Sequence, residues 1–251
     1  YYHYRNLHLP YNPSEPYDRL FTDSDFDRDG FTRERVASVR ENVTIPLGTL
    51  TFSPSDSTWV RGLYDGQLRE MDETFFRPLI QKLKALGLYD RTLVIVTADH
   101  GEELLEHGFI GHPSTSFRGS AYEEQIRIPL IMTCPAAIPG GARVRSQVQN
   151  VDILPTALDF LGLPIPQSVQ GRSVREVISG RQTDERPAYT ETTQGGYQST
   201  PDMMKVRVRA HRAPPWKLIH TLGPGIDRYE LYNLEDDPSE RRDVSGEQPE
   251  I

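Results

Sequence analysis

The chain has 251 residues, of which 36% are hydrophobic and 25% are charged, with 19 glycines and 20 prolines. This length and composition are typical of one or two loop-rich globular domains, and they exclude a disordered chain, a fibrous protein or a disulfide-stapled mini-protein. The formal net charge of -8, from 28 basic and 36 acidic residues, disfavours a nucleic-acid backbone or an anionic membrane surface as a general partner.

The ends and the cysteine content of the chain say little about its location. The chain opens at Tyr1 without an initiator methionine or a leader segment, so we expect a fragment of a longer protein. Its longest apolar runs, such as residues 93–96, are far shorter than the roughly 20 residues that cross a bilayer, and we expect no membrane span. The single cysteine, Cys134, cannot form an internal disulfide. Localisation is therefore left open between periplasmic, secreted and cytoplasmic.

The first half of the chain predicts an extended start and one long helix. Residues 1–21 run from an aromatic segment into a proline-rich turn, and residues 22–58 are acidic and turn-rich, as in an excursion over the surface. From Val60 to Leu86 apolar residues recur every three or four positions, the pattern of an amphipathic helix. We expect Asp56 or Ser57 to cap this helix, Pro78 to kink it and Gly87 to end it.

The middle of the chain predicts an α/β fold. Residues 92–98 form a short, continuously apolar and β-branched run, which is typical of a strand buried on both faces of a parallel sheet. Residues 128–132 predict a second buried strand, and residues 146–151 a further short one. Residues 153–162 predict a helix that Gly162 ends. We therefore expect a mostly parallel sheet flanked by helices.

After Arg186 the sequence pattern changes to short runs of alternating apolar and polar residues, separated by glycine and proline. These runs predict a small antiparallel sheet. We accordingly divide the chain into an α/β part at residues 1–185 and a small antiparallel C-terminal α+β subdomain at residues 186–251.

The strongest candidate site follows the predicted strand 92–98 and reads Thr-Ala-Asp-His-Gly-Glu-Glu over residues 97–103. Ligand sites of open α/β sheets lie beyond the carboxyl ends of the strands, so Asp99 and His100 are placed to face a substrate or a metal. The alternative is that Asp99 caps the next helix and His100 is an ordinary loop histidine. His107 and His112 follow closely, and such a group of histidines is consistent with metal binding or with neutralising an anion.

These residues resemble the sulfatase family of the alkaline phosphatase superfamily. The resemblance rests on residues 92–102, on Glu-His-Gly at 106–108 and on residues 122–131. Three more stretches agree in order: His8-Leu9-Pro10, Asp-x-x-Pro-Thr at 152–156, and Leu-Tyr-Asn-Leu-x-x-Asp-Pro at 231–238. The resemblance covers nearly the whole chain and implies an alkaline phosphatase-like fold and cleavage of sulfate monoesters.

The resemblance also implies roles for single residues. Asp99 and His100 fall where the family places two metal ligands, and His8 matches a histidine that contacts the sulfate and protonates the leaving alcohol. His112 lies near the position of a sulfate-binding lysine, for which a protonated imidazole would substitute; Arg118 is the weaker substitute. The expected cofactor is one divalent cation, Ca²⁺ in the first place, with Mn²⁺ or Mg²⁺ as alternatives.

One part of the family's pattern is missing. Sulfatases attack with a formylglycine made within Cys-x-Pro-x-Arg, and Cys134, followed by Pro-Ala-Ala, does not match that motif. We therefore expect the formylglycine upstream of this chain, and expect the chain alone to be an incomplete and inactive portion of the enzyme. The expected partner is a small-molecule or glycan sulfate ester.

Two other readings stay open. A phosphoester hydrolase or phosphoethanolamine transferase of the same superfamily would share the Asp99-His100 pair but use another nucleophile. A non-catalytic calcium-binding scaffold would instead use residues 25–30, Asp-Phe-Asp-Arg-Asp-Gly, which match the first half of an EF-hand loop. That loop has Val36 where the bidentate glutamate belongs, which favours a solvated acidic turn.

Overall fold

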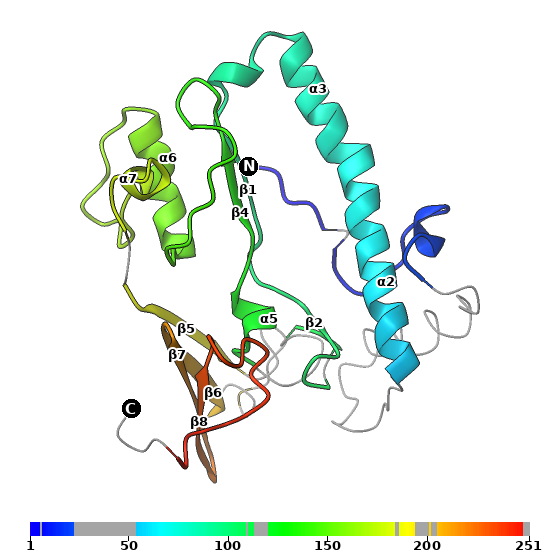
Figure 1. The fold of residues 1–251 in the computed structure, drawn as a ribbon, viewed down its shortest axis with the longest axis vertical. Coiled ribbons are helices and arrows are strands. Elements are labelled where there is room, and N and C mark those ends of the chain that lie inside the picture. Colours follow the sequence, from blue (N-terminus) through cyan, green and yellow to red (C-terminus); the bar gives the residue numbers. More distant parts are fainter. Residues whose placement is uncertain are drawn as a thin grey trace.

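A computed structural model describes residues 1–5, 7–22, 54–108, 110–112, 120–183, 186–193, 201 and 205–247. Residues 25–30, Val36 and Arg118, which the sequence singled out, lie outside these ranges. The main elements of the described part are one long helical rod, two two-stranded sheets, three short α-helices and a four-stranded sheet (Figure 1). None of the helices within it is long and apolar enough to cross a lipid bilayer.

The predicted long helix is present but interrupted. It consists of α2 (Pro54–Met71), a π-helical turn (Asp72–Phe76) and α3 (Arg77–Ala85). Pro78 lies in the first turn of α3 and has no N–H to donate to the preceding turn, so the break falls just before it. The helix begins at Pro54, so the predicted cap at Asp56 or Ser57 is wrong. Gly87 ends the rod with a φ of +64°, as predicted.

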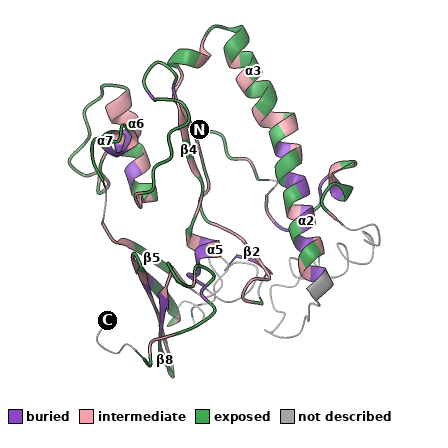
Figure 2. Ribbon diagram, in the orientation of Figure 1, coloured by how far each residue is buried: buried purple, intermediate pink, exposed green. Residues whose placement is uncertain are grey.

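The predicted apolar strands pair with each other, but not in a parallel sheet. β1 (Val94–Thr97) and β4 (Leu130–Thr133) are antiparallel, with Val94 opposite Thr133 and Thr97 opposite Leu130. All strand pairs within the described ranges are antiparallel, so the prediction of a mostly parallel sheet is not confirmed. An apolar run predicts burial and not the direction of its neighbour, and even the burial is partial here (Figure 2).

The segments after β4 form two short helices, and a buried aspartate just before the first binds the segment that leads into the second. They are α6 (Ile153–Phe160), as predicted, and α7 (Arg175–Ile178), whereas the strand predicted at 146–151 is absent and a 3₁₀ turn occupies Asn150–Asp152. The Asp152 carboxylate accepts the N–H of Gln149 at 3.0 Å and of Arg172 at 2.9 Å. The Asp-x-x-Pro-Thr motif therefore has a structural role in this protein.

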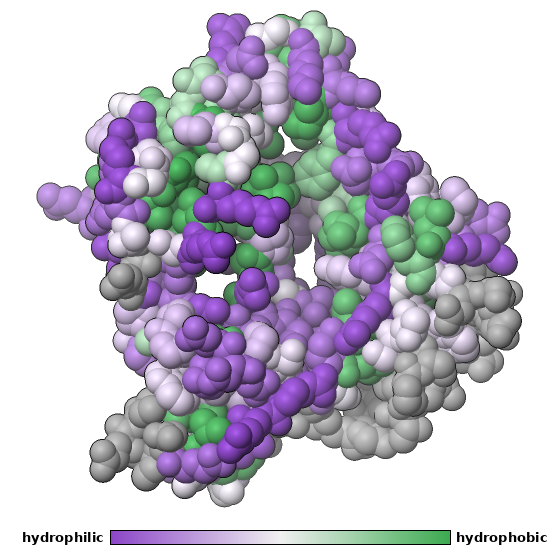
Figure 3. Space-filling model, in the orientation of Figure 1, coloured by the Kyte–Doolittle hydropathy of each residue, from purple (hydrophilic) through white to green (hydrophobic). Residues whose placement is uncertain are grey.

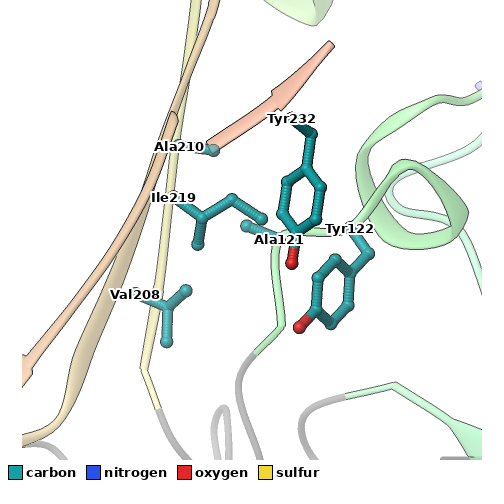
Figure 4. Packing of buried hydrophobic residues seen from close by; sticks show 6 residues of the cluster. All are labelled: Ala121, Tyr122, Val208, Ala210, Ile219 and Tyr232. Carbon is teal, nitrogen blue, oxygen red and sulfur yellow. The ribbon is translucent and has the colours of Figure 1, made fainter. Parts of the chain in front are cut away.

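The predicted antiparallel sheet of the C-terminal part is present. Its order is β5 (Ala188–Thr193), β6 (Arg207–Ala213), β7 (Trp216–Gly223) and β8 (Ile226–Asn233). One face packs on the segment that enters α5 (Glu123–Ile126), through a cluster drawn in Figure 4: Ala121, Tyr122, Val208, Ala210, Ile219 and Tyr232. This packing brings the C-terminal sheet up to the helix that lies beneath the candidate site.

Candidate functional site

The N-terminal segment is fastened to the long helix by a small apolar core. Leu9 and Tyr11 are fully buried and pack with Val60 and Leu63 of α2 and with Ile110. His8 precedes this anchor, and its Nδ1 lies 2.7 Å from the carbonyl oxygen of Leu9. Because a carbonyl only accepts, Nδ1 carries the hydrogen and the neutral ring has its lone pair on Nε2. The core therefore sets both the place and the tautomer of His8.

Asp99 and His100 follow directly after β1, as the sequence predicted. The Nδ1 of His100 lies 2.8 Å from the carbonyl oxygen of Gly101, so the lone pair of the neutral ring is again on Nε2. That Nε2 lies 3.9 Å from Oδ2 of Asp99. Both side chains are exposed, 43% for His100 and 64% for Asp99, so a ligand from solvent can reach them.

A hairpin whose two strands have two residues each places Glu102 opposite His112. β2 (Glu103–Leu104) and β3 (Ile110–Gly111) pair with Glu103 opposite Gly111, and the same register extended by one residue sets Glu102 against His112. The Oε2 of Glu102 lies 3.1 Å from Nδ1 of His112, and both side chains are buried. As an ionised carboxylate only accepts, this contact puts a hydrogen on Nδ1 of His112.

Tyr11 holds the other oxygen of Glu102. Its hydroxyl donates to Oε1 of Glu102 at 2.6 Å. Burial, and next the negative charge of Glu102, raise the pKa of the Tyr11 phenol well above its usual value, so Tyr11 stays a donor at any physiological pH. The carboxylate of Glu102 is thus fixed between the N-terminal core and His112.

The three segments bring their histidines together. The ring centroid of His112 lies 4.6 Å from that of His8 and 4.4 Å from that of His100. Asp99 adjoins His100, so the four residues that the sequence assigned to the site, which come from three separate stretches of chain, lie in one group.

The donor atoms of this group fit a divalent cation. Two ligands of one ion with bonds of about 2.0–2.6 Å lie within about 5 Å of each other. The Asp99 and His100 atoms meet this limit, and so do one atom each of His100, Glu102 and His112, which all lie within 4.8 Å of one another. His100 is common to both sets. The mixture of imidazole nitrogen and carboxylate oxygen does not by itself distinguish the predicted Ca²⁺ from Mn²⁺.

Two sequence candidates have other surroundings. His107 stacks on Tyr122 with centroids 3.8 Å apart, and its Nδ1 lies 3.4 Å from a carboxylate oxygen of Glu124. Burial alone would lower the pKa of His107, but the hydrogen bond and charge of Glu124 outweigh it and raise that pKa. Cys134 is buried at the end of β4, 3.6 Å from the carbonyl oxygen of Asp90. Both fit structural roles.

Sequence reasoning missed three neighbours of the site. Glu102 stood within a quoted motif and Tyr11 directly follows one, but only the pairing of β2 with β3 and the Tyr11–Glu102 hydrogen bond show that they support His112. The Nε2 of His3 lies 4.0 Å from Oδ2 of Asp99, and nothing in the sequence around His3 signals this. In this histidine cluster the buried carboxylate of Glu102 contacts His112, and the exposed carboxylate of Asp99 adjoins His100. Such an arrangement can hold an anion and a cation side by side.

Comparisons with known proteins agree on one family. A family model described as Sulfatase matches residues 1–163, and one described as N-sulphoglucosamine sulphohydrolase, C-terminal, matches residues 106–250.

Curated relatives are sulfatases of greater length. N-acetylglucosamine-6-O-sulfatase of Bacteroides thetaiotaomicron is 33% identical over 178 residues, which cover 70% of this chain and 30% of that protein. Arylsulfatase K of Homo sapiens is 29% identical over 206 residues, which cover 80% of this chain and 36% of that protein. The chain therefore spans about a third of the length of the curated relatives that it matches.

Solved structures share the fold. One in complex with its substrate, D-glucosamine-2-N,6-O-disulfate, is 28% identical with a TM-score of 0.66 and covers 86% of this chain and 41% of that chain. Phosphonate monoester hydrolase from Silicibacter pomeroyi is 24% identical with a TM-score of 0.69 and covers 95% of this chain and 50% of that chain. The second likeness shows a common fold alone.

Proposed function

The chain belongs to the sulfatase family, and on that premise we propose that it forms the cation- and sulfate-binding part of an enzyme that hydrolyses sulfate monoesters. This proposal rests on the close approach of three histidines from three stretches of chain. The ring centroids of His8 and His100 lie 4.6 Å and 4.4 Å from that of His112. Three imidazoles beside a carboxylate suit the anionic sulfate group of an ester held against a cation.

We propose that Asp99 and His100 hold the cation, with Ca²⁺ preferred and Mn²⁺ or Mg²⁺ as alternatives. The tautomer of His100 supports this, because the Nδ1 hydrogen is bound by the Gly101 carbonyl and the metal-binding lone pair is on Nε2, 3.9 Å from Asp99. A bound divalent cation would polarise the sulfate ester and stabilise the negative charge of the transition state.

His8 and His112 are proposed to bind the sulfate. Glu102 orients the ring of His112, since its Oε2 lies 3.1 Å from Nδ1 and both side chains are buried. His112 would then provide the positive charge that other family members take from lysine. His8 is proposed to act as an imidazolium that gives its Nε2 proton to the alcohol oxygen as the S–O bond breaks, while the Nδ1 hydrogen stays bound to the Leu9 carbonyl and keeps the ring oriented.

The nucleophile is proposed to be a formylglycine outside residues 1–251. The sequence contains no Cys-x-Pro-x-Arg, and the chain corresponds to only about a third of its curated relatives. Exposed apolar residues on α6 and β4, including Leu154 and Ile131, which is 59% exposed, agree with more polypeptide covering this part. Apolar surface borders the hollow between the long helix and the rest of the molecule in Figure 3.

The proposed substrate class is a sulfate ester on a glycan. A relative is named N-acetylglucosamine-6-O-sulfatase, and a similar structure holds a glucosamine disulfate as its substrate. A phosphoester hydrolase on the same fold is the second candidate, and its support is the fold that the chain shares with phosphonate monoester hydrolase.

The test is release of inorganic sulfate by the full-length protein that contains this chain, on sulfated amino sugars and on the matching phosphate esters. We expect sulfate release that His112→Ala reduces at least about a hundredfold. His220→Ala, which changes a histidine of the C-terminal sheet, serves as the control and should keep the wild-type rate. Faster hydrolysis of the phosphate esters would favour the second candidate and contradict the first.

A further inference from the structure

α5 contains a buried residue, Gln125, that bonds to both of the loops that form the site. Gln125 is 5% exposed. Its main-chain carbonyl accepts the N–H of Gly101 at 2.8 Å, and its side-chain Nε2 donates to the carbonyl of Gly111 at 2.8 Å. Gly101 follows His100 and Gly111 precedes His112 in the sequence. One residue thus spans the two loops, one residue away from each histidine.

We infer that Gln125 is a positioning residue that fixes the distance between His100 and His112, an inference that rests on the proposed function of those histidines. The side-chain amide is the only part of Gln125 that reaches the His112 loop in the contacts above, so the side chain itself carries the link. A displacement of either loop would stretch a hydrogen bond and leave a buried polar group without a partner, which costs about 1–3 kcal/mol.

The two loops are shaped to accept this link. A Cβ at Gly101 would lie 1.8 Å from the carbonyl oxygen of Glu124, so only glycine lets the loop of His100 lie directly on α5. Gly111, whose carbonyl accepts the Gln125 side chain, has a φ of +85°, a conformation that favours glycine. Both backbones therefore depend on small residues at the points where Gln125 holds them.

α5 is in turn fixed by buried charges of the C-terminal sheet. Glu123 accepts two hydrogen bonds of 3.0 Å from Arg212 in β6 and lies 3.2 Å from Nζ of Lys217 in β7. Lys217 is fully buried and also lies 2.7 Å from Glu240, whose other oxygen accepts the N–H of Glu123 at 2.6 Å. The chain of contacts runs from the C-terminal sheet through α5 to both histidines.

The test replaces Gln125 by methionine, which has nearly the same length and no hydrogen-bond donor. In the metal-free full-length protein, we expect Gln125→Met to shift the imidazole ¹⁵N–¹H signals of His100 and His112 and to leave those of His220 unchanged. We also expect the affinity for a sulfate ester to fall about tenfold, because the variant frees the loop of His112, the proposed sulfate ligand. Gln67→Ala removes a buried amide from α2 and is the matched control for stability loss alone.

Two outcomes separate this inference from the proposed function. If wild type neither binds Ca²⁺ nor releases sulfate but the histidine signals still shift, the proposed function fails and the positioning link stands. If wild type is active and Gln125→Met changes neither the signals nor the affinity more than Gln67→Ala, the link is overturned. Should the methionine variant not fold, Gln125→Asn, which is one methylene too short to reach Gly111, is judged by the same two measurements.

Discussion

Glu102 lies opposite His112 at the open end of the β2–β3 hairpin, with its Oε2 3.1 Å from Nδ1 of the imidazole. Tyr11 holds the second oxygen of the same carboxylate at 2.6 Å. A histidine that is oriented in this way can, in its protonated form, bind an anion as a lysine would, although its reach is shorter.

Glu102→Gln should weaken substrate binding. The amide replaces a carboxylate that accepts a hydrogen bond from Nδ1 of His112, and a hydrogen bond to a charged group contributes about 1.5–3 kcal/mol. We expect KM for a sulfate ester to rise at least about tenfold, measured by steady-state kinetics on the full-length protein. Glu191→Gln, at an exposed ion pair of β5 and β6, is the control. An unchanged KM would show that His112 does not depend on Glu102.

His8→Gln should reduce turnover most for substrates with poor leaving groups. A general acid contributes about 10²–10⁴-fold when the departing oxygen needs a proton. We therefore expect a loss of that order for sulfates of sugar alcohols and a much smaller loss for sulfates of acidic phenols. The measurement is kcat across a series of esters graded by the pKa of the alcohol. Equal losses along the series would exclude His8 as the proton donor.

Lys217→Met should destabilise the whole protein. Removing the buried ammonium leaves Glu240 without a counter-charge and Glu123 with Arg212 alone, and breaking such a pair costs about 3–5 kcal/mol. Chemical denaturation gives the free energy of unfolding. Lys82→Met, on the exposed side of α3, should change it by less than about 0.5 kcal/mol. Adding Glu240→Gln should restore part of the loss, and no restoration would contradict this electrostatic account.

Glu103 should make the protein less stable as the pH rises. Burial raises the pKa of Glu103 to about 7, although the hydrogen bond from Ser120 acts to lower that pKa. The folded protein therefore holds a proton that the unfolded chain loses above about pH 4.5. The free energy of unfolding falls by about 3 kcal/mol between that pH and about pH 7, and it then levels off. In thermal melts, Glu103→Gln should flatten this slope and Glu15→Gln, at an exposed carboxylate, should keep it. Equal slopes in wild type and Glu103→Gln would be inconsistent with a protonated Glu103.

Local sequence patterns predicted the elements that depend on local physics. The apolar spacing of residues 60–86 predicted the long helix, and Gly87 predicted where it ends. The apolar runs at 92–98 and 128–132 predicted the strands β1 and β4. The pairing direction of β1 did not follow, because a continuous apolar run is the same for a parallel and an antiparallel neighbour. The helix also began at Pro54, ahead of the expected cap.

The site was predicted as a set of residues but not as an arrangement. His8, Asp99, His100 and His112 were all named from motifs, and the structure brings them together. The partners that orient them were not, because Glu102 reaches His112 only through the register of two-residue strands, and Gln125 reaches Gly111 only through tertiary packing. Strands of that length have no periodicity from which pairing could be read.

The most direct test of the account is equilibrium dialysis of Ca²⁺ against the full-length protein, its Asp99→Ala variant and its Asp25→Ala variant, with sulfate release measured on the same samples. The account predicts that Asp25→Ala keeps the bound ion and the activity, whereas Asp99→Ala loses both. An Asp99→Ala variant that binds Ca²⁺ and releases sulfate as well as wild type does would contradict the proposed site.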